Sequence, residues 1–317
     1  MPNLTRRNIL AAAFSLALPR TLGAQGTIFD FDIAIIGAGA AGLAAARECA
    51  RLGRSFVLVE ARQRIGGRVF TDRSLGEPFD AGAVYIHWAE RNPWTEVAKS
   101  LGVETREDKG GADAFQFFDH GLPTIRNPRR RRAFEQISEL LDIDAGKARD
   151  VSIADVVAPL GEEAARAGGT LARMSLGEEP ERVSAMDYAR LWSGDDLLVP
   201  SGYGDLVARY GADVPVRLGV AVQSVDYSGA GVVLGTAQGS FSARRAVITV
   251  PAGVLAAGGI IFNPALPVAT QEGIAGLGMG NLAKIALKFD GERFGIPEGT
   301  DVFDAEGPRE LFDFECF

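Results

Sequence analysis

Three glycines and one acidic residue form the first group in the chain whose spacing indicates chemistry. Gly37, Gly39 and Gly42 make a Gly-x-Gly-x-x-Gly sequence, and Glu60 follows at the spacing of about 20 residues that is typical of dinucleotide binding. The first glycine permits a tight turn, the second lets the backbone approach a pyrophosphate, and the third lets a helix pack closely on a strand. The acidic side chain would accept hydrogen bonds from a ribose.

These residues need a strand, a turn and a helix in succession. Residues 31–36 form a short run rich in β-branched isoleucine and bounded by Gly37, which predicts a buried parallel strand. Residues 43–52 predict a helix that ends at Gly53, and residues 55–59 predict a second strand. The start of the helix supplies unpaired N–H groups and the positive end of its dipole to a phosphate. The cofactor-binding residues expected from this unit are Gly37, Gly39, Ala40, Ala41, Gly42 and Glu60.

The segment after Glu60 resembles the flavin-containing amine oxidases. It reads Glu-Ala-Arg at 60–62 and Gly-Gly-Arg-Val at 66–69. The group includes monoamine, polyamine and L-amino-acid oxidases, and the resemblance implies FAD as cofactor. It also implies that the paired glycines pass close to the flavin diphosphate, where two N–H groups and a guanidinium suit a phosphate. The residues that match are Ala61, Arg62 on the adenosine side, Gly66, Gly67 and Arg68.

A second segment, residues 79–88, extends the resemblance and in the family runs along the flavin ring. It reads Phe-Asp-Ala-Gly-Ala-Val-Tyr-Ile-His-Trp. His87 matches a histidine in the substrate tunnel of some polyamine oxidases, and a structural role for His87 stays equally open. Trp88 departs from the glycine that the family often has there. The cofactor contacts that the segment implies are Gly82, Ala83, Val84 and Tyr85.

Two later stretches continue the resemblance. Residues 198–206 resemble the family's Val-Pro-x-Gly turn leading into a helix. Residues 216–226 alternate as a strand, in which Val222 matches a valine that offers its backbone to the adenine ring. After a hairpin, residues 247–250 predict a buried strand that ends at Pro251, where the family closes the sheet of its flavin domain.

Lys284 is the residue with the strongest claim to chemistry. Only five of the 33 basic residues are lysines, and residues 278–289 predict a turn and a strand with Lys284 and Lys288 on one face. Two solvated lysines on a half-exposed strand are the alternative. In the family a lysine at the place of Lys284 holds a water against the flavin, and partial burial would lower its pKa. Lys288 is expected to face solvent.

The predicted fold class is α/β, a Rossmann-type FAD-binding domain with a discontinuous α+β substrate domain. The FAD domain is expected at 28–108 and 196–262, and the substrate domain at 109–195 and 263–317. Helical patterns at 133–141, 153–157, 162–174 and 186–193 belong to the substrate domain. Because family members run well past the lysine strand, the C-terminal part is expected to be missing.

Composition and the N-terminal sequence restrict the partners, the metal sites and the location that can be expected. A formal charge of −8 argues against nucleic acid and anionic membrane as partners, and two histidines with two cysteines argue against a metal site. Residues 1–26 carry paired arginines, a short apolar run and small residues, which resembles a twin-arginine export signal. The apolar run is too short to span a membrane. A periplasmic or secreted location follows.

The function that the resemblance implies is FAD-dependent oxidation of a primary or secondary amine, polyamine or amino acid. The amine becomes an imine, water converts the imine to an aldehyde or ketone, and O2 is reduced to H2O2. Two alternatives stay open. One is a related desaturase-like or protoporphyrinogen-oxidase-like enzyme, and the other is a non-catalytic, truncated flavin-binding remnant.

Overall fold

The computed structural model describes residues 29–108, 115–119, 122–124, 137, 150–191, 194–290, 301–304 and 312–315. The predicted export signal at 1–26 and most of the predicted helix at 133–141 lie outside these residues. No helix within the described part is long and apolar enough to cross a membrane.

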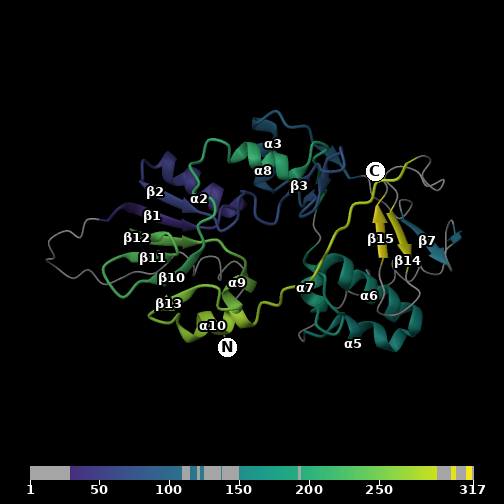
Figure 1. The fold of residues 1–317 in the computed structure, drawn as a ribbon. Helices are drawn as coiled ribbons and strands as arrows, with labels where there is room; N and C mark the ends of the chain where they lie inside the picture. Colours follow the sequence, from purple (N-terminus) through teal and green to yellow (C-terminus); the bar gives the residue numbers. More distant parts are fainter. Residues whose placement is uncertain are drawn as a thin grey trace.

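A six-stranded mixed sheet is the largest element of the fold (Figure 1). Its strand order is β13-β10-β11-β12-β1-β2, and β1 pairs in parallel with both β12 and β2. The strands are β1 Phe31–Ile36, β2 Phe56–Val59, β10 Val222–Asp226, β11 Val232–Thr236, β12 Gly239–Ile248 and β13 Ile261–Asn263. The predicted α/β class with a parallel sheet is therefore confirmed.

Both faces of the second half of β1 are buried, which explains the apolar sequence of residues 33–36. Ile35 packs in one core cluster, with Leu43 of helix α2 (Ala40–Arg51) and Leu206 of helix α8 (Tyr203–Tyr210). Ala34 and Ile36 point to the opposite face and pack in a second cluster. β1 is therefore an interior strand of the sheet, lying between β12 and the edge strand β2.

The predicted strand–turn–helix–strand unit is confirmed, with small shifts of its boundaries. Helix α2 begins at Ala40, three residues before the expected start, and Gly53 adopts φ 63° just after its end. The expected strand at 216–226 is shorter, because only Val222–Asp226 pairs as β10. The predicted strand at 247–250 is the end of the longer β12, whose first half pairs with β11 and whose second half pairs with β1.

Helices and short strands complete the description. A third core cluster joins helices α5 and α6 with α7, away from the six-stranded sheet (Figure 1). The helices are α3 Pro93–Ser100, α5 Ile153–Val157, the short 3-10 helix η1 Ala158–Leu160, α6 Glu162–Leu176, α7 Ala185–Ala189, α9 Ala252–Ala256 and α10 Val268–Ala275. The short strands are β3 Thr71–Asp72, β4 Phe79–Asp80, β5 Tyr85–Ile86, β6 Arg106–Glu107, β7 Phe115–Asp119, β8 Leu122–Thr124, β9 Leu197–Leu198, β14 Asp301–Asp304 and β15 Phe312–Glu315.

The expected strand around Lys284 is wrong. Residues 281–289 form no strand and instead run as an extended segment between α10 and β14, drawn in yellow-green to yellow in Figure 1. Alternation in a sequence predicts a strand only where a neighbouring strand accepts its hydrogen bonds. The side chains of Leu282, Ile285 and Phe289 are exposed accordingly, with Ile285 at 83%.

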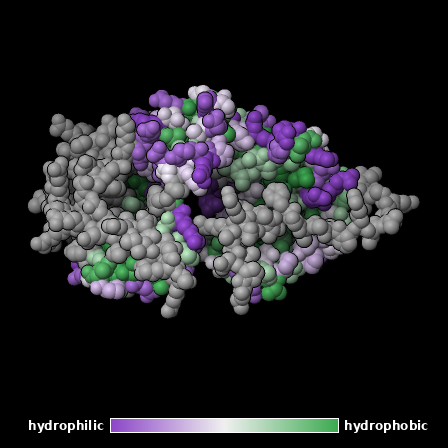
Figure 2. All heavy atoms as spheres, turned by 180° about the vertical axis from the view of Figure 1, so that it is seen from behind, coloured by the Kyte–Doolittle hydropathy of each residue, from purple (hydrophilic) through white to green (hydrophobic). Residues whose placement is uncertain are grey.

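On the face shown in Figure 2, the coloured residues along the top are mostly hydrophilic, and hydrophobic groups lie among them and along the lower edge. This distribution agrees with a chain in which 23% of the residues are charged.

Candidate functional site

Two glycines of the fingerprint, Gly37 and Gly42, occupy positions where a Cβ would collide with neighbouring atoms. Gly37 adopts φ 100°, a conformation that L-residues with a side chain rarely take. A Cβ on Gly42 would lie 1.8 Å from the Gly37 carbonyl oxygen. The turn after β1 therefore closes tightly on the start of helix α2, as the spacing predicts.

Gly39 is different, because the space where its side chain would lie is open. It caps helix α2 with extended backbone and with no side-chain hydrogen bond to the helix. The nearest non-neighbouring atom to a Cβ built on Gly39 is the Gly67 Cα, at 3.9 Å. The first N–H groups of the helix, at Ala40 and Ala41, face this opening with the positive end of the helix dipole. An uncapped helix start beside open space fits a pyrophosphate.

A second glycine turn meets the first. The Gly66 N–H donates to the Ala38 carbonyl at 2.9 Å, and Gly39 and Gly66 form an isolated parallel bridge. Gly67 adopts φ 60°, and its Cβ would approach Gly39 Cα to 3.3 Å. The structure thus brings two glycine segments to one helix end. Arg68 follows them and is exposed, and its carbonyl accepts the Ala83 N–H at 3.1 Å.

Glu60 is buried at the end of β2, and backbone N–H groups hold both of its carboxylate oxygens. The Ala38 N–H donates to Oε2 at 2.8 Å and the Arg62 N–H to Oε1 at 2.9 Å. Each oxygen can accept a second hydrogen bond, so the geometry permits the predicted ribose contact. Ala61 and Arg62 are exposed beside it.

Val222 and Pro251 are predicted to contact the cofactor. Each lies two residues after a residue that is hydrogen-bonded to Glu60 or to the fingerprint turn. Val222 is buried at the start of β10, two residues after Val220, whose N–H donates to the Glu60 carbonyl at 2.8 Å. Pro251 caps helix α9, two residues after Thr249.

Sequence reasoning missed Thr249. Its hydroxyl lies 2.8 Å from the Ile36 carbonyl oxygen and 2.9 Å from that of Gly37, so it fastens the end of β12 to the fingerprint turn. A single threonine at the end of an apolar strand was the only available signal.

Lys284 reaches the segment that was expected to run along the flavin ring. Its ammonium donates to the Gly82 carbonyl at 2.8 Å and to the Asp80 carbonyl at 3.2 Å. Lys284 itself is exposed, so the partial burial expected for it is wrong. Lys288, expected to face solvent, is exposed and donates to the Leu75 carbonyl at 2.9 Å.

Gly82 lies where the backbone is crowded, and Ala83 beside it is exposed. A Cβ on Gly82 would approach the Arg68 carbonyl oxygen to 1.9 Å. The two residues that follow, Val84 and Tyr85, lead into strand β5 and are half-buried. The structure therefore joins the Gly66–Gly67 turn, the 80–85 segment and Lys284 in one continuous region.

His87 is paired with an acidic residue that the sequence did not indicate. Its Nδ1 lies 3.0 Å from the Asp196 carboxylate, and the histidine side chain is 56% exposed. The Tyr85 and His87 rings lie 5.4 Å apart between centroids. The contact forms because β5 pairs with β9, which places residue 196 beside residue 87. Trp88 follows with φ 55°, unusual for an aromatic residue.

No group of three potential metal ligands occurs among the residues that the structure describes. The donor set of the site is backbone N–H groups, one buried carboxylate and basic side chains. These groups fit a phosphate-containing organic cofactor.

Comparisons with known proteins agree with this geometry. The family model described as "Flavin containing amine oxidoreductase" matches residues 40–306. The mouse protein "Lysine-specific histone demethylase 1B" is 32% identical over 81% of this chain and 34% of its own length. "Probable polyamine oxidase 4" of Arabidopsis thaliana is 30% identical over 82% of this chain and 58% of its own length.

Solved structures share the fold. Cyclohexylamine oxidase from Brevibacterium oxydans IH-35A superposes with a TM-score of 0.62 at 25% identity, over 78% of this chain and 63% of that one. A putrescine oxidase variant gives a TM-score of 0.64 at 21% identity, over 77% of this chain and 63% of that one. The chain thus spans between about a third and three-fifths of the length of these curated relatives.

Proposed function

The chain belongs to the flavin-containing amine oxidoreductase family, whose cofactor is FAD, and from that premise we propose that it oxidises a small amine with O2 as the electron acceptor. The overall reaction for a primary amine is R–CH2–NH2 + O2 + H2O → R–CHO + NH3 + H2O2. The observation that carries the proposal is the meeting of two glycine turns at an uncapped helix start beside a buried carboxylate.

The residues that would hold FAD divide into two groups. The start of helix α2, with Gly39 and Gly67, would bind the pyrophosphate through backbone N–H groups. Glu60 would accept hydrogen bonds from the ribose, and Arg68 would add positive charge near the phosphates. The chemistry that the flavin supplies when bound is acceptance of a hydride equivalent from the carbon next to the amine nitrogen, and return of those electrons to O2.

The segment 80–85 and Lys284 would form the reactive side of the site. The carbonyls of Asp80 and Gly82 orient the Lys284 ammonium at this segment. From there Lys284 would position a water for hydrolysis of the imine or for the step with O2. Its charge would also favour negative charge that develops nearby.

The amine would approach from the side of His87. Asp196 binds Nδ1 of His87 and so sets the orientation of the ring. A net charge of −8 raises the local concentration of cationic amines around the protein. Residues 150–191, with their own helical core, belong to the proposed substrate domain together with 263–290, and residues 29–108 and 196–262 to the FAD domain.

Purification of the full chain tests the proposal directly. We expect a yellow protein from which heat releases FAD, and peroxide formation with at least one member of a panel of monoamines, polyamines, cyclic amines, amino acids and an N-methyl-lysine peptide. A flavin-loaded protein that forms no peroxide with any of them would contradict amine oxidation with O2. A desaturase-like enzyme would instead reduce its flavin with a substrate that has no amine.

We further propose that residues 1–26 direct export by the twin-arginine route, which carries folded proteins and thus suits a protein that binds its cofactor first. N-terminal sequencing of exported protein should begin near residue 25. An exported protein that still begins with Met1 would contradict cleavage.

A further inference from the structure

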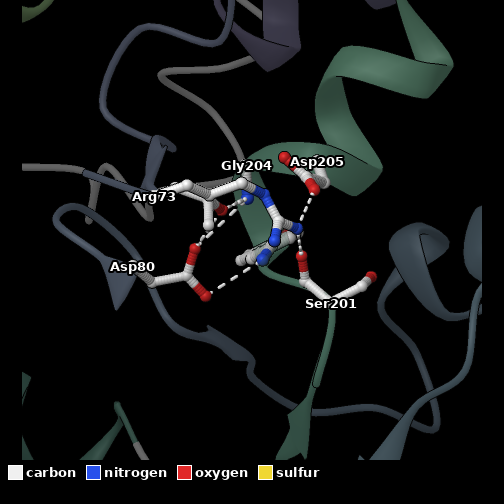
Figure 3. Close-up of polar contacts among 7 residues, drawn as sticks. Arg73, Asp80, Ser201, Gly204 and Asp205 are labelled. Carbon is white, nitrogen blue, oxygen red and sulfur yellow. Dashed lines mark hydrogen bonds and ion pairs between the residues drawn. The ribbon is translucent and has the colours of Figure 1, made fainter. Parts of the chain in front are cut away.

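The segment 198–206, which the sequence singles out as a turn leading into a helix, lies against the residue that holds Lys284. Helix α8 begins at Tyr203, after Gly202 with φ 97° and no side-chain cap of its own. A cap comes from a distant part of the chain instead. The Tyr203 N–H donates to Asp80 Oδ2 at 2.9 Å, and the Gly204 N–H donates to the Thr71 hydroxyl at 2.8 Å. Figure 3 labels Asp80 and Gly204 at this helix start.

Asp80 and Thr71 act together because strands β3 and β4 pair them directly. The Thr71 hydroxyl donates to Asp80 Oδ1, so the carboxylate receives hydrogen bonds on both oxygens. A Cβ on Gly204 would lie 2.2 Å from the Thr71 backbone nitrogen. The glycine at 204 therefore lets the helix start lie directly on the strand pair.

A second set of contacts lies at the same helix start. Arg73 donates to the Ser201 carbonyl at 2.7 Å and pairs with Asp205 in the first turn of the same helix (Figure 3). The Arg73 and Asp205 side chains are partly exposed. Asp205 thus offers a matched control, since it is an acidic residue at the same helix end that lacks the link to Lys284.

The backbone of Asp80 faces the reactive side. Its carbonyl oxygen accepts the Lys284 ammonium at 3.2 Å, and the Gly82 carbonyl two residues later accepts it at 2.8 Å. We infer that Asp80 is a positioning residue, whose carboxylate anchors the 80–82 turn to helix α8 so that the carbonyls of the turn hold Lys284 in place. The inference rests on the proposed function for the claim that the position of Lys284 matters to turnover.

Chemical labelling of lysine tests the link without any need for turnover. The full-length protein loaded with FAD is treated with N-hydroxysuccinimidyl acetate, and mass spectrometry follows acetylation of Lys284 relative to Lys99, an exposed lysine of helix α3. Asp80→Ala should raise this acetylation ratio about fivefold or more. Fivefold is the change in an equilibrium that corresponds to the loss of one typical hydrogen bond, here one that holds the Lys284 ammonium. Asp80→Asn, which keeps one acceptor oxygen, should raise it less.

The control is Asp205→Asn, which should leave the ratio unchanged. An unchanged ratio in Asp80→Ala, or an equal rise in Asp205→Asn, would overturn the inference. If Asp80→Ala does not fold, Asp80→Asn and Thr71→Val carry the same test with smaller perturbations.

Turnover adds a second measurement, which distinguishes action of Asp80 through Lys284 from a purely structural role of Asp80. Because small misplacements of groups in an active site cost roughly 100-fold, Asp80→Ala should lower kcat by about 10- to 100-fold. In a Lys284→Met background the same substitution should have little further effect. Equal losses in both backgrounds would refute action through Lys284. If no amine is oxidised by the unmodified protein, the proposed function fails, whereas the labelling ratio still decides the role of Asp80.

Discussion

Replacing Gly39 and Gly42 separately by alanine should separate cofactor binding from folding. The two glycines lie in the same fingerprint, but their surroundings differ. A Cβ on Gly39 meets nothing closer than 3.9 Å, and the backbone there has φ −75°, which alanine adopts readily. A Cβ on Gly42 would lie 1.8 Å from a backbone oxygen.

The structure gives each substitution a magnitude. At Gly39, alanine is a poorer helix cap than glycine by about 1 kcal/mol or less, and the lower entropy of the unfolded chain offsets about 0.4–1 kcal/mol of this. Stability without FAD should therefore change little. The added methyl group occupies the space proposed for the pyrophosphate, and overpacking of about 1–3 kcal/mol weakens FAD binding by about 5- to 150-fold. Gly42→Ala should cost about 3 kcal/mol or more in folding itself.

The assay is the rise in Tm that FAD produces. FAD at about 100 times its Kd stabilises a protein by about 2.7 kcal/mol, and a 100-fold weaker Kd reduces this to about 0.4 kcal/mol. Gly39→Ala should thus melt like the unmodified protein without FAD and lose most of the rise with FAD. Gly42→Ala should melt several degrees lower in both conditions. A full rise in Gly39→Ala would refute the placement of the pyrophosphate at the start of helix α2.

Three further outcomes are expected at neighbouring positions. Thr249→Val removes the hydroxyl proton that the Ile36 and Gly37 carbonyls share, and it should lower stability by about 1–2 kcal/mol in chemical denaturation, while Thr249→Ser should keep most of that stability. Glu60→Ala leaves the Ala38 and Arg62 N–H groups without their carboxylate partner, so it should destabilise the protein by about 1–3 kcal/mol and also weaken FAD binding, whereas loss of stability alone would argue against the ribose contact. Burial first, and the negative charge of Asp80 second, raise the pKa of Tyr203 to about 12. Because the unfolded chain loses this proton near pH 10, stability should fall between pH 10 and 12 by up to about 2–3 kcal/mol more in the unmodified protein than in Tyr203→Phe.

The glycine-rich unit at residues 31–53 could be predicted because its contacts are close in sequence. One local unit, residues 31–53, contains the strand, the turn and the helix. The spacing of its glycines indicates which backbone positions must lie close to one another. The role of Thr249 could not be predicted, because its contact with the turn requires β12 to lie beside β1. No local sequence pattern indicates that pairing.

The structure of the region around Lys284 could not be predicted by periodicity. The alternation of residues 282–289 indicates a strand, yet in the structure the ammonium of Lys284 holds the segment to the carbonyls of Asp80 and Gly82. A lysine side chain long enough to reach a neighbouring turn can fix a segment that lacks a strand partner. Side-chain contacts of this kind have no period, so the pattern could not show them.

Asp80 shows most clearly why the proposed reactive side depends on distant residues. Its carboxylate binds a helix start more than a hundred residues later in the chain, and its carbonyl binds a lysine later still. A change at the Tyr203 N–H should therefore alter the contact of the Lys284 ammonium, and the reverse, because Asp80 binds both. Substitutions in the first turn of helix α8 that displace the Tyr203 N–H should alter Lys284, although they touch neither the lysine nor the proposed cofactor site. By contrast, substitutions in Arg73 or Asp205 should change the stability of the helix end alone.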